Sequence, residues 1–215
     1  MIDDHARTHD RDLAIMLALA QATVAQQIGV ALAATSPGLV TSPFHFIATG
    51  YGLSVAALAV HTLRTALAQG KLAAAAAAHV SLLGLFGLRL AAFLHFRSQT
   101  ESYAARPEMA DVKKRMTSVP LAKRVLMWIP VSVMYAAMCA PAHYTAVSPP
   151  PGLPPIHSAT VLGLCGMAAG LGLEAVADQH KSALKAKDAS KFCNTGVYAQ
   201  KYLSCEIGKG NKLGH

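Results

Sequence analysis

Five long apolar runs, separated by short polar segments, dominate the hydrophobic pattern of the chain. A helix needs about 20 apolar residues to cross the hydrocarbon core of a bilayer, and each run reaches that length. The runs are Leu13–Ala34, Phe44–Ala68, Leu72–Phe96, Val125–Val147 and His157–Ala177. The pattern therefore predicts an all-α fold, a polytopic integral membrane bundle of about five transmembrane helices.

The third run, Leu72–Phe96, gives the weakest insertion signal because it contains the alanine series Ala73–Ala78. Alanine contributes little to insertion, but small side chains allow neighbouring helices to approach closely. Gly84 and Gly87 extend that property toward the other end of the run. We therefore expect this helix at a crowded position inside the bundle.

Composition agrees with a membrane protein. The chain is 53% hydrophobic and only 14% charged, whereas soluble domains carry about 25% charged residues. The four cysteines show no CxxC spacing, and none of the ten histidines stands at the spacing of a metal-ligand motif. We expect no metal site, and the absence of a Gly-rich phosphate loop argues against a Rossmann fold.

The basic residues collect between the apolar runs and give a formal net charge of +8. The positive-inside rule explains this distribution, so we expect no nucleic-acid partner. Residues 97–124 hold seven lysines and arginines, residues 179–215 hold another seven, and the segments on the opposite side hold four. With five spans, the first two segments share the cytoplasmic side. The N-terminus and residues 148–156 then face away from it.

Arg89 is the one arginine deep inside the third run, about 10 Å of helix rise before Phe96. An arginine inside a membrane span indicates a functional site by default. The alternative is that its long side chain reaches the cytoplasmic interface. Arg97 follows two helical turns later near the same face, and a pair of arginines there would suit phosphate groups.

A second group of charges begins in the fifth run and continues beyond it. Glu174, Asp178, Lys181 and Lys185 stand at i, i+4, i+7 and i+11, so all four share one helical face. The carboxylates could accept hydrogen bonds from ribose or amide groups, and the lysines could meet phosphates. On spacing alone, the simpler interpretation is a helix end that carries i,i+4 ion pairs.

Three stretches of the chain resemble the membrane family called DUF1295, which is related to the steroid 5-alpha-reductases. The segment Glu174–Lys181 resembles its E-x-x-A-D-x-Q-K signature, with His180 in place of the glutamine. Leu88–Arg97 is similar to its R-L-x-x-x-L-x-x-R segment. Lys191–Tyr198 looks like its F-x-x-x-G-L-W approach, with tyrosine in place of tryptophan.

The resemblance implies an NADPH-dependent reductase that acts on a carbon–carbon double bond of a lipid or steroid-like substrate. It implies that Glu174 and Asp178 help to hold the cofactor and that basic side chains face its phosphates. The cofactor-binding residues implied in this way are Arg89, Arg97, Glu174, Asp178, Lys181, Lys185, Gly196 and Tyr198. The resemblance does not identify a catalytic proton donor.

The resemblance ends at Tyr198. The family continues with R-H-P-N-Y-x-G-E and a further membrane helix, and residues 199–215 contain neither. We expect one reductase-like membrane domain over residues 1–198, incomplete at its C-terminus. Residues 199–215 are expected to form a basic tail that is disordered or partly helical, and a longer transcript is expected to continue from about Tyr198.

Two other functions remain open. Isoprenylcysteine methyltransferases share a similar membrane core but use S-adenosylmethionine, and the chain could instead be a non-enzymatic remnant or partner of a full-length protein. The lipid bilayer is the expected surrounding in each case. The expected location is the endoplasmic reticulum or another endomembrane, with a plastid membrane as the alternative.

Overall fold

The computed structural model describes residues 21–41, 43–70, 72–100, 111–112, 114–116, 118–148 and 158–187. Within these ranges every regular element is a helix and no strand occurs. The predicted all-α class is therefore confirmed for the described part of the chain. The predicted C-terminal tail lies outside the described residues.

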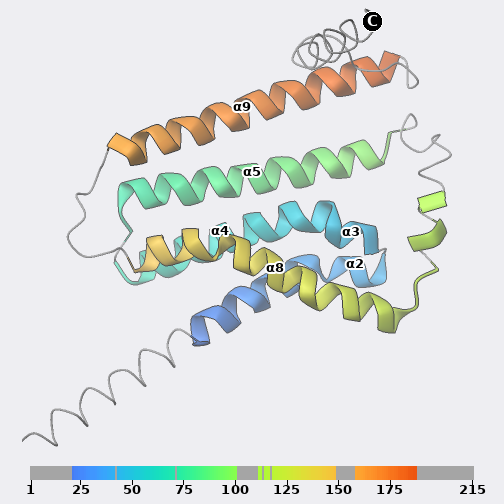
Figure 1. The fold of residues 1–215 in the computed structure, drawn as a ribbon, viewed down its shortest axis with the longest axis horizontal. Helices are drawn as coiled ribbons and strands as arrows, with labels where there is room; N and C mark the ends of the chain where they lie inside the picture. The colour runs from blue at the N-terminus through green and yellow to red at the C-terminus, as the bar shows by residue number, and fades with distance from the viewer. Residues whose placement is uncertain are drawn as a thin grey trace, which may run out of the picture.

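Long helices that alternate in direction form the bundle (Figure 1). They are the helical residues 21–35, then α4 (Thr49–Ala68), α5 (Ala74–Ser98), α8 (Leu121–Val147) and α9 (Ser158–Lys187). Two short helices, α2 (Pro37–Val40) and α3 (Pro43–Ile47), connect the first of these to α4. Because of the alternation, α5 and α9 end at the same end of the molecule, where α8 begins (Figure 1).

Among the described helices, α5, α8 and α9 are long and apolar enough to cross a membrane. The chain is thus a multi-pass membrane protein by length and composition, but the predicted count of about five spans is not confirmed. Helix α4 has 20 residues, yet its glycines and threonines, with His61 and Arg64, reduce its hydropathy. The first predicted run lies partly outside the described residues.

The second predicted run, Phe44–Ala68, is not one continuous helix, and here the prediction was wrong. Ala48 separates α3 from α4 with φ −93° and ψ −90°, outside the helical region. Phe46 is fully buried and packs against the backbone of Gly38. The Tyr135 hydroxyl donates a hydrogen bond to the Phe46 carbonyl at 3.1 Å. This bond satisfies a carbonyl that the end of α3 leaves without an intrahelical donor.

Helices α4 and α5 approach so closely that two glycines face each other. A Cβ atom at Gly52 would lie 2.6 Å from the Gly87 carbonyl oxygen, and a Cβ atom at Gly87 would lie 2.6 Å from the Gly52 carbonyl oxygen. At Gly84 a Cβ atom would lie 3.2 Å from the Ala59 Cβ atom. The predicted role of Gly84 and Gly87 in close helix packing is thereby confirmed.

Two apolar clusters fill the space between the helices. One is centred on Leu58 of α4 and Cys139 of α8, with Ala31 from the first helical segment. The other joins Ala66 of α4 with Ala146 of α8, and with Val80 of α5. Both clusters include residues of α4, α5 and α8. Their centres follow one another along the bundle axis, so they form two successive layers.

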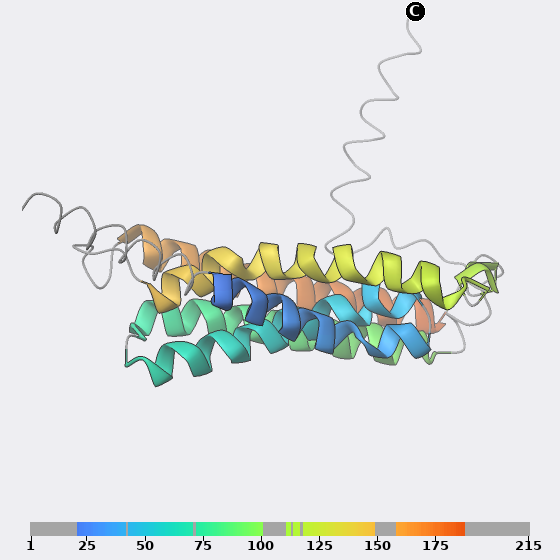
Figure 2. The same ribbon diagram turned by 90° about the horizontal axis from the view of Figure 1, so that it is seen from below.

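Helix α9 lies at the edge of the bundle, beside α5 (Figure 1 and Figure 2). None of its 30 residues is buried. Leu162 and Leu173 are among its exposed large apolar side chains. An exposed apolar surface of this length is compatible with lipid surroundings. Because α9 buries no residue, its polar contacts with α5 are the main interactions that hold it against the bundle.

The protein is expected to stay in the membrane pellet after extraction with alkaline carbonate and to need detergent for release. The physical reason is the exposed apolar surface of α5, α8 and α9, which loses about 25 cal/mol for each Å² transferred to water. The measurement is an immunoblot of pellet and supernatant, with a peripheral membrane protein as control. Recovery of a monodisperse protein without detergent would contradict the membrane assignment.

Candidate functional site

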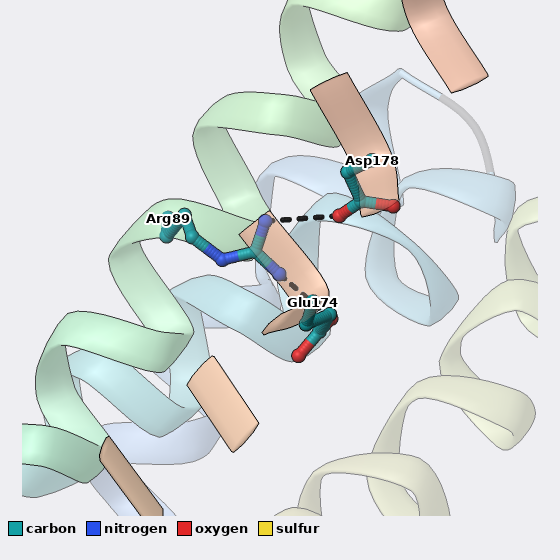
Figure 3. Close-up of polar contacts among 3 residues, drawn as sticks. All are labelled: Arg89, Glu174 and Asp178. Atoms are coloured by element: carbon teal, nitrogen blue, oxygen red, sulfur yellow. Dashed lines mark hydrogen bonds and ion pairs between the residues drawn. The ribbon is translucent and has the colours of Figure 1, made fainter. Parts of the chain in front are cut away.

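Arg89 joins α5 to α9 through two carboxylates (Figure 3). Its Nη2 atom lies 2.7 Å from Oε1 of Glu174, and its Nη1 atom lies 2.9 Å from Oδ2 of Asp178. The side chains are 23% exposed for Arg89, 41% for Glu174 and 21% for Asp178. The arginine inside the third run therefore has both of its carboxylate partners on the neighbouring helix α9.

The two contacts of Arg89 differ in kind. The contact with Asp178 is a hydrogen bond from Nη1 to Oδ2. The contact with Glu174 is an ion pair by distance, but its angle is not that of a hydrogen bond. Nε and Nη2 of Arg89 are buried and have no hydrogen-bond acceptor among the described residues. Because Glu174 already lies beside Nη2, the Nε–H group is the donor that the α5–α9 contact leaves available.

One face of α9 places the carboxylates against α5. The partly buried positions of this helix begin with Leu164, Met167 and Leu171, at helical spacing, and the charged residues continue the same line. Because α9 extends to Lys187, Glu174, Asp178, Lys181 and Lys185 all belong to one continuous helix. The predicted shared face is confirmed. Its apolar half packs in the bundle and its charged half carries the site.

The basic residues predicted for phosphates lie at the same end of the bundle. Lys181 and Lys185 follow the carboxylates on the partly buried side of α9. Arg97 lies in the last turn of α5, where its guanidinium carbon is 5.9 Å from the centre of the Phe93 ring. Gly196 and Tyr198, the other predicted contacts, lie outside the described residues.

Tyr51 of α4 is a candidate site residue that the sequence analysis did not name. Its ring packs against Phe86 of α5, one helical turn before Arg89, at 6.4 Å between centroids, and against Tyr135 of α8 at 5.1 Å. Helix periodicity places Tyr51 on a face of α4, but it does not indicate which residues of other helices lie near that face.

Charges of both signs meet at this end of the bundle. Arg89 faces two carboxylates, and Lys181 and Lys185 follow on the same face of α9. Each carboxylate contacts Arg89 through one oxygen, so its second oxygen can accept a hydrogen bond from a hydroxyl or amide. Among the described residues, no group of three or more His, Cys, Asp or Glu side chains could hold a metal ion.

Comparison with known proteins gives one match. The model of the family described as "Protein of unknown function (DUF1295)" matches residues 38–201. That range covers most of the described helices and includes Arg89, Glu174 and Asp178. No curated protein and no solved structure matches the chain.

Proposed function

We propose, from the premise that the chain belongs to the DUF1295 family, that it is a membrane-embedded reductase. In this proposal it uses NADPH to reduce a carbon–carbon double bond of a lipid or steroid-like substrate, in the endoplasmic reticulum or another endomembrane. The observation that carries the proposal is the Arg89–Glu174–Asp178 contact. This contact brings together Leu88–Arg97 and Glu174–Lys181, two of the segments that resemble the reductase family.

The residues of the site suit the polar groups of a dinucleotide. The second oxygens of Glu174 and Asp178 would accept hydrogen bonds from ribose hydroxyls or an amide. Lys181, Lys185 and Arg97, farther along toward the helix ends, would meet the phosphates. Arg89 would hold both carboxylates in place and donate to the cofactor through Nε. We also predicted Arg89 as a phosphate contact, and that role stays a prediction. The two carboxylates that contact its guanidinium already neutralise the positive charge that a phosphate would need.

NADPH would supply a hydride to the β carbon of an activated alkene. The protein would have to stabilise the negative charge that develops on the conjugated carbonyl oxygen. Tyr51 contacts Phe86, which lies one helical turn before Arg89 on α5, and we assign its phenol the role of proton donor to that oxygen. The aromatic contacts of Tyr51 with Phe86 and Tyr135 would fix its ring and exclude water from one side of the site.

The two carboxylates at the Arg89 contact support a second candidate. S-Adenosylmethionine carries a sulfonium cation, which these carboxylates would attract. The second function is therefore a methyltransferase of the isoprenylcysteine type. Titration of the detergent-purified protein with each cofactor separates the two functions. Failure of both to bind would favour a non-enzymatic membrane protein.

Asp178→Asn is expected to weaken NADPH binding about tenfold, because a charge-assisted hydrogen bond contributes roughly 1.5–3 kcal/mol. Asparagine keeps the size of the side chain and one acceptor oxygen, so the fold should survive. The measurement is a fluorescence titration of NADPH against each variant. Asp111→Asn removes an exposed carboxylate outside the site and should leave the dissociation constant unchanged. If both variants bind NADPH equally well, the charged residues Glu174, Asp178, Lys181 and Lys185 only stabilise the end of helix α9 and do not hold a cofactor.

A further inference from the structure

A second polar cluster lies in the bundle, away from the α5–α9 contact. His143 of α8 has its Nδ1 atom 2.9 Å from the Gln27 Nε2 atom and 2.9 Å from the Thr62 Oγ1 atom. Gln27 belongs to the first helical segment and Thr62 to α4. The three residues are 3–5% exposed. Polar side chains from three helices thus meet inside the bundle, away from the surface.

His61 adds a second imidazole to this cluster. Its ring lies parallel to that of His143, with 6.0 Å between centroids and 10° between planes. Three polar atoms of the cluster are buried and have no hydrogen-bond partner among the described residues. They are Gln27 Oε1, His61 Nε2 and His143 Nε2. A buried polar atom without a partner costs about 1–3 kcal/mol, so three in one cluster indicate a ligand.

The hydrogen bonds define the chemistry of that ligand. With Gln27 Nε2 donating to His143 Nδ1, the neutral ring carries its hydrogen on Nε2. His143 Nε2 is then an unpartnered donor and Gln27 Oε1 an unpartnered acceptor. If the amide of Gln27 is reversed, both roles reverse. Between Gln27 and His143, either orientation leaves one donor and one acceptor, and His61 Nε2 adds a third ring or amide atom without a partner. The matching ligand therefore both donates and accepts. A hydroxyl group or water does so; a metal ion or a ketone does not.

The position of the cluster favours a small neutral group. Thr62 lies between Ala59 and Ala66 on α4, and His143 lies between Cys139 and Ala146 on α8, so the cluster lies among the apolar residues of the core. His143 lies four residues before the end of α8, about 6 Å of helix rise. A ligand that enters from that end of the bundle would reach His143 after this short distance. The apolar part of the ligand would then lie among apolar side chains.

We propose that Gln27, His61 and His143 form a binding site for a single hydroxyl group within the membrane. The occupant is the hydroxyl of a lipid alcohol or a water molecule, since both supply one donor and one acceptor. The site does not depend on the proposed reductase function, and none of its residues belongs to the Arg89 contact.

The test uses the full chain in nanodiscs and a long-chain alcohol that carries a diazirine on its alkyl chain. The matched probe is its methyl ether, which has lost the donor. If a lipid alcohol is the occupant, the alcohol should label peptides around Gln27, His61 or His143 about tenfold more than the ether. His143→Leu and the milder Gln27→Met should remove this preference. Ser132→Ala, in a separate hydrogen-bonded network of α8, should keep it.

Water as the occupant gives a different result. The alcohol and the ether then label equally. Protein labelled with ¹⁵N in histidine and glutamine side chains shows an NMR cross-peak between a long-lived water and either the His143 Nε2 hydrogen or a Gln27 amide hydrogen, according to the orientation of the amide. That cross-peak should disappear in Gln27→Met. Equal labelling together with no water cross-peak would overturn the proposal. So would alcohol-selective labelling that both His143→Leu and Gln27→Met retain.

Discussion

Arg89→Ala is expected to detach α9 from α5 and to destroy the candidate site. Without the guanidinium, Glu174 and Asp178 face each other as unpaired carboxylates at the edge of an apolar bundle. An exposed ion pair contributes about 0.2–1 kcal/mol, and loss of one partner of a buried pair costs about 3–5 kcal/mol. Exposures of 21–41% place this loss between those limits, at about 2 kcal/mol, or roughly 4–8 °C in Tm.

Thermal unfolding in detergent and hydrogen exchange of α9 peptides measure this effect. Arg64→Ala is the matched control, because Arg64 is an exposed arginine of α4 and its loss should leave both quantities unchanged. Arg89→Lys should recover part of the stability, since a lysine provides the charge but not two parallel donors. If Arg89→Ala has the same Tm as the unaltered chain and the same hydrogen-exchange protection of α9, then the Arg89 contact does not hold α9 against α5.

Gly87→Leu should prevent the protein from folding into a stable bundle. Its Cβ atom would lie 2.6 Å from the Gly52 carbonyl oxygen, a backbone atom that cannot rotate away. The only relief is separation of α4 from α5, which would also separate the layers around Val80 and Leu58. We expect a loss above about 4 kcal/mol, the range of the most severe single substitutions, and no monodisperse peak in detergent size-exclusion chromatography.

Gly170→Leu provides the control for this prediction. It adds the same side chain to a glycine of an apolar helix, but a Cβ atom at Gly170 would meet nothing within 4 Å. This variant should elute as the unaltered protein does. If both leucine variants behave alike, the effect comes from helix propensity or insertion, and the close approach of α4 and α5 does not limit stability.

The candidate site was only partly predictable. The shared face of Glu174 and Asp178 follows from their four-residue spacing, because the angular position of a residue on its own helix is fixed by a local repeat. The contact of both carboxylates with Arg89, and the nearness of Tyr51, depend on which helices become neighbours. No repeat within a helix encodes that choice.

The same distinction applies to the buried polar residues. In the sequence His143 is one of ten histidines, none of which stands at the spacing of a metal-ligand motif. Its contacts with Gln27 and Thr62 join residues 116 and 81 positions apart. Trp128 similarly donates to Thr35 across 93 positions. Hydrogen bonds of this range require the three-dimensional arrangement before any partner can be named.

By itself, the sequence determined the helical class, the apolar surface of α5, α8 and α9, and the charged line along α9, since these depend on local composition and helical period. The tertiary structure decided the break between α3 and α4, because burial of Phe46 and its carbonyl contact with Tyr135 outweigh the continuous apolar run. It also decided that Arg89 binds across to α9. A charge inside the membrane pairs with the opposite charge that helix packing brings near it. Which helices pack together depends on the complementarity of their surfaces, and no single helix encodes that.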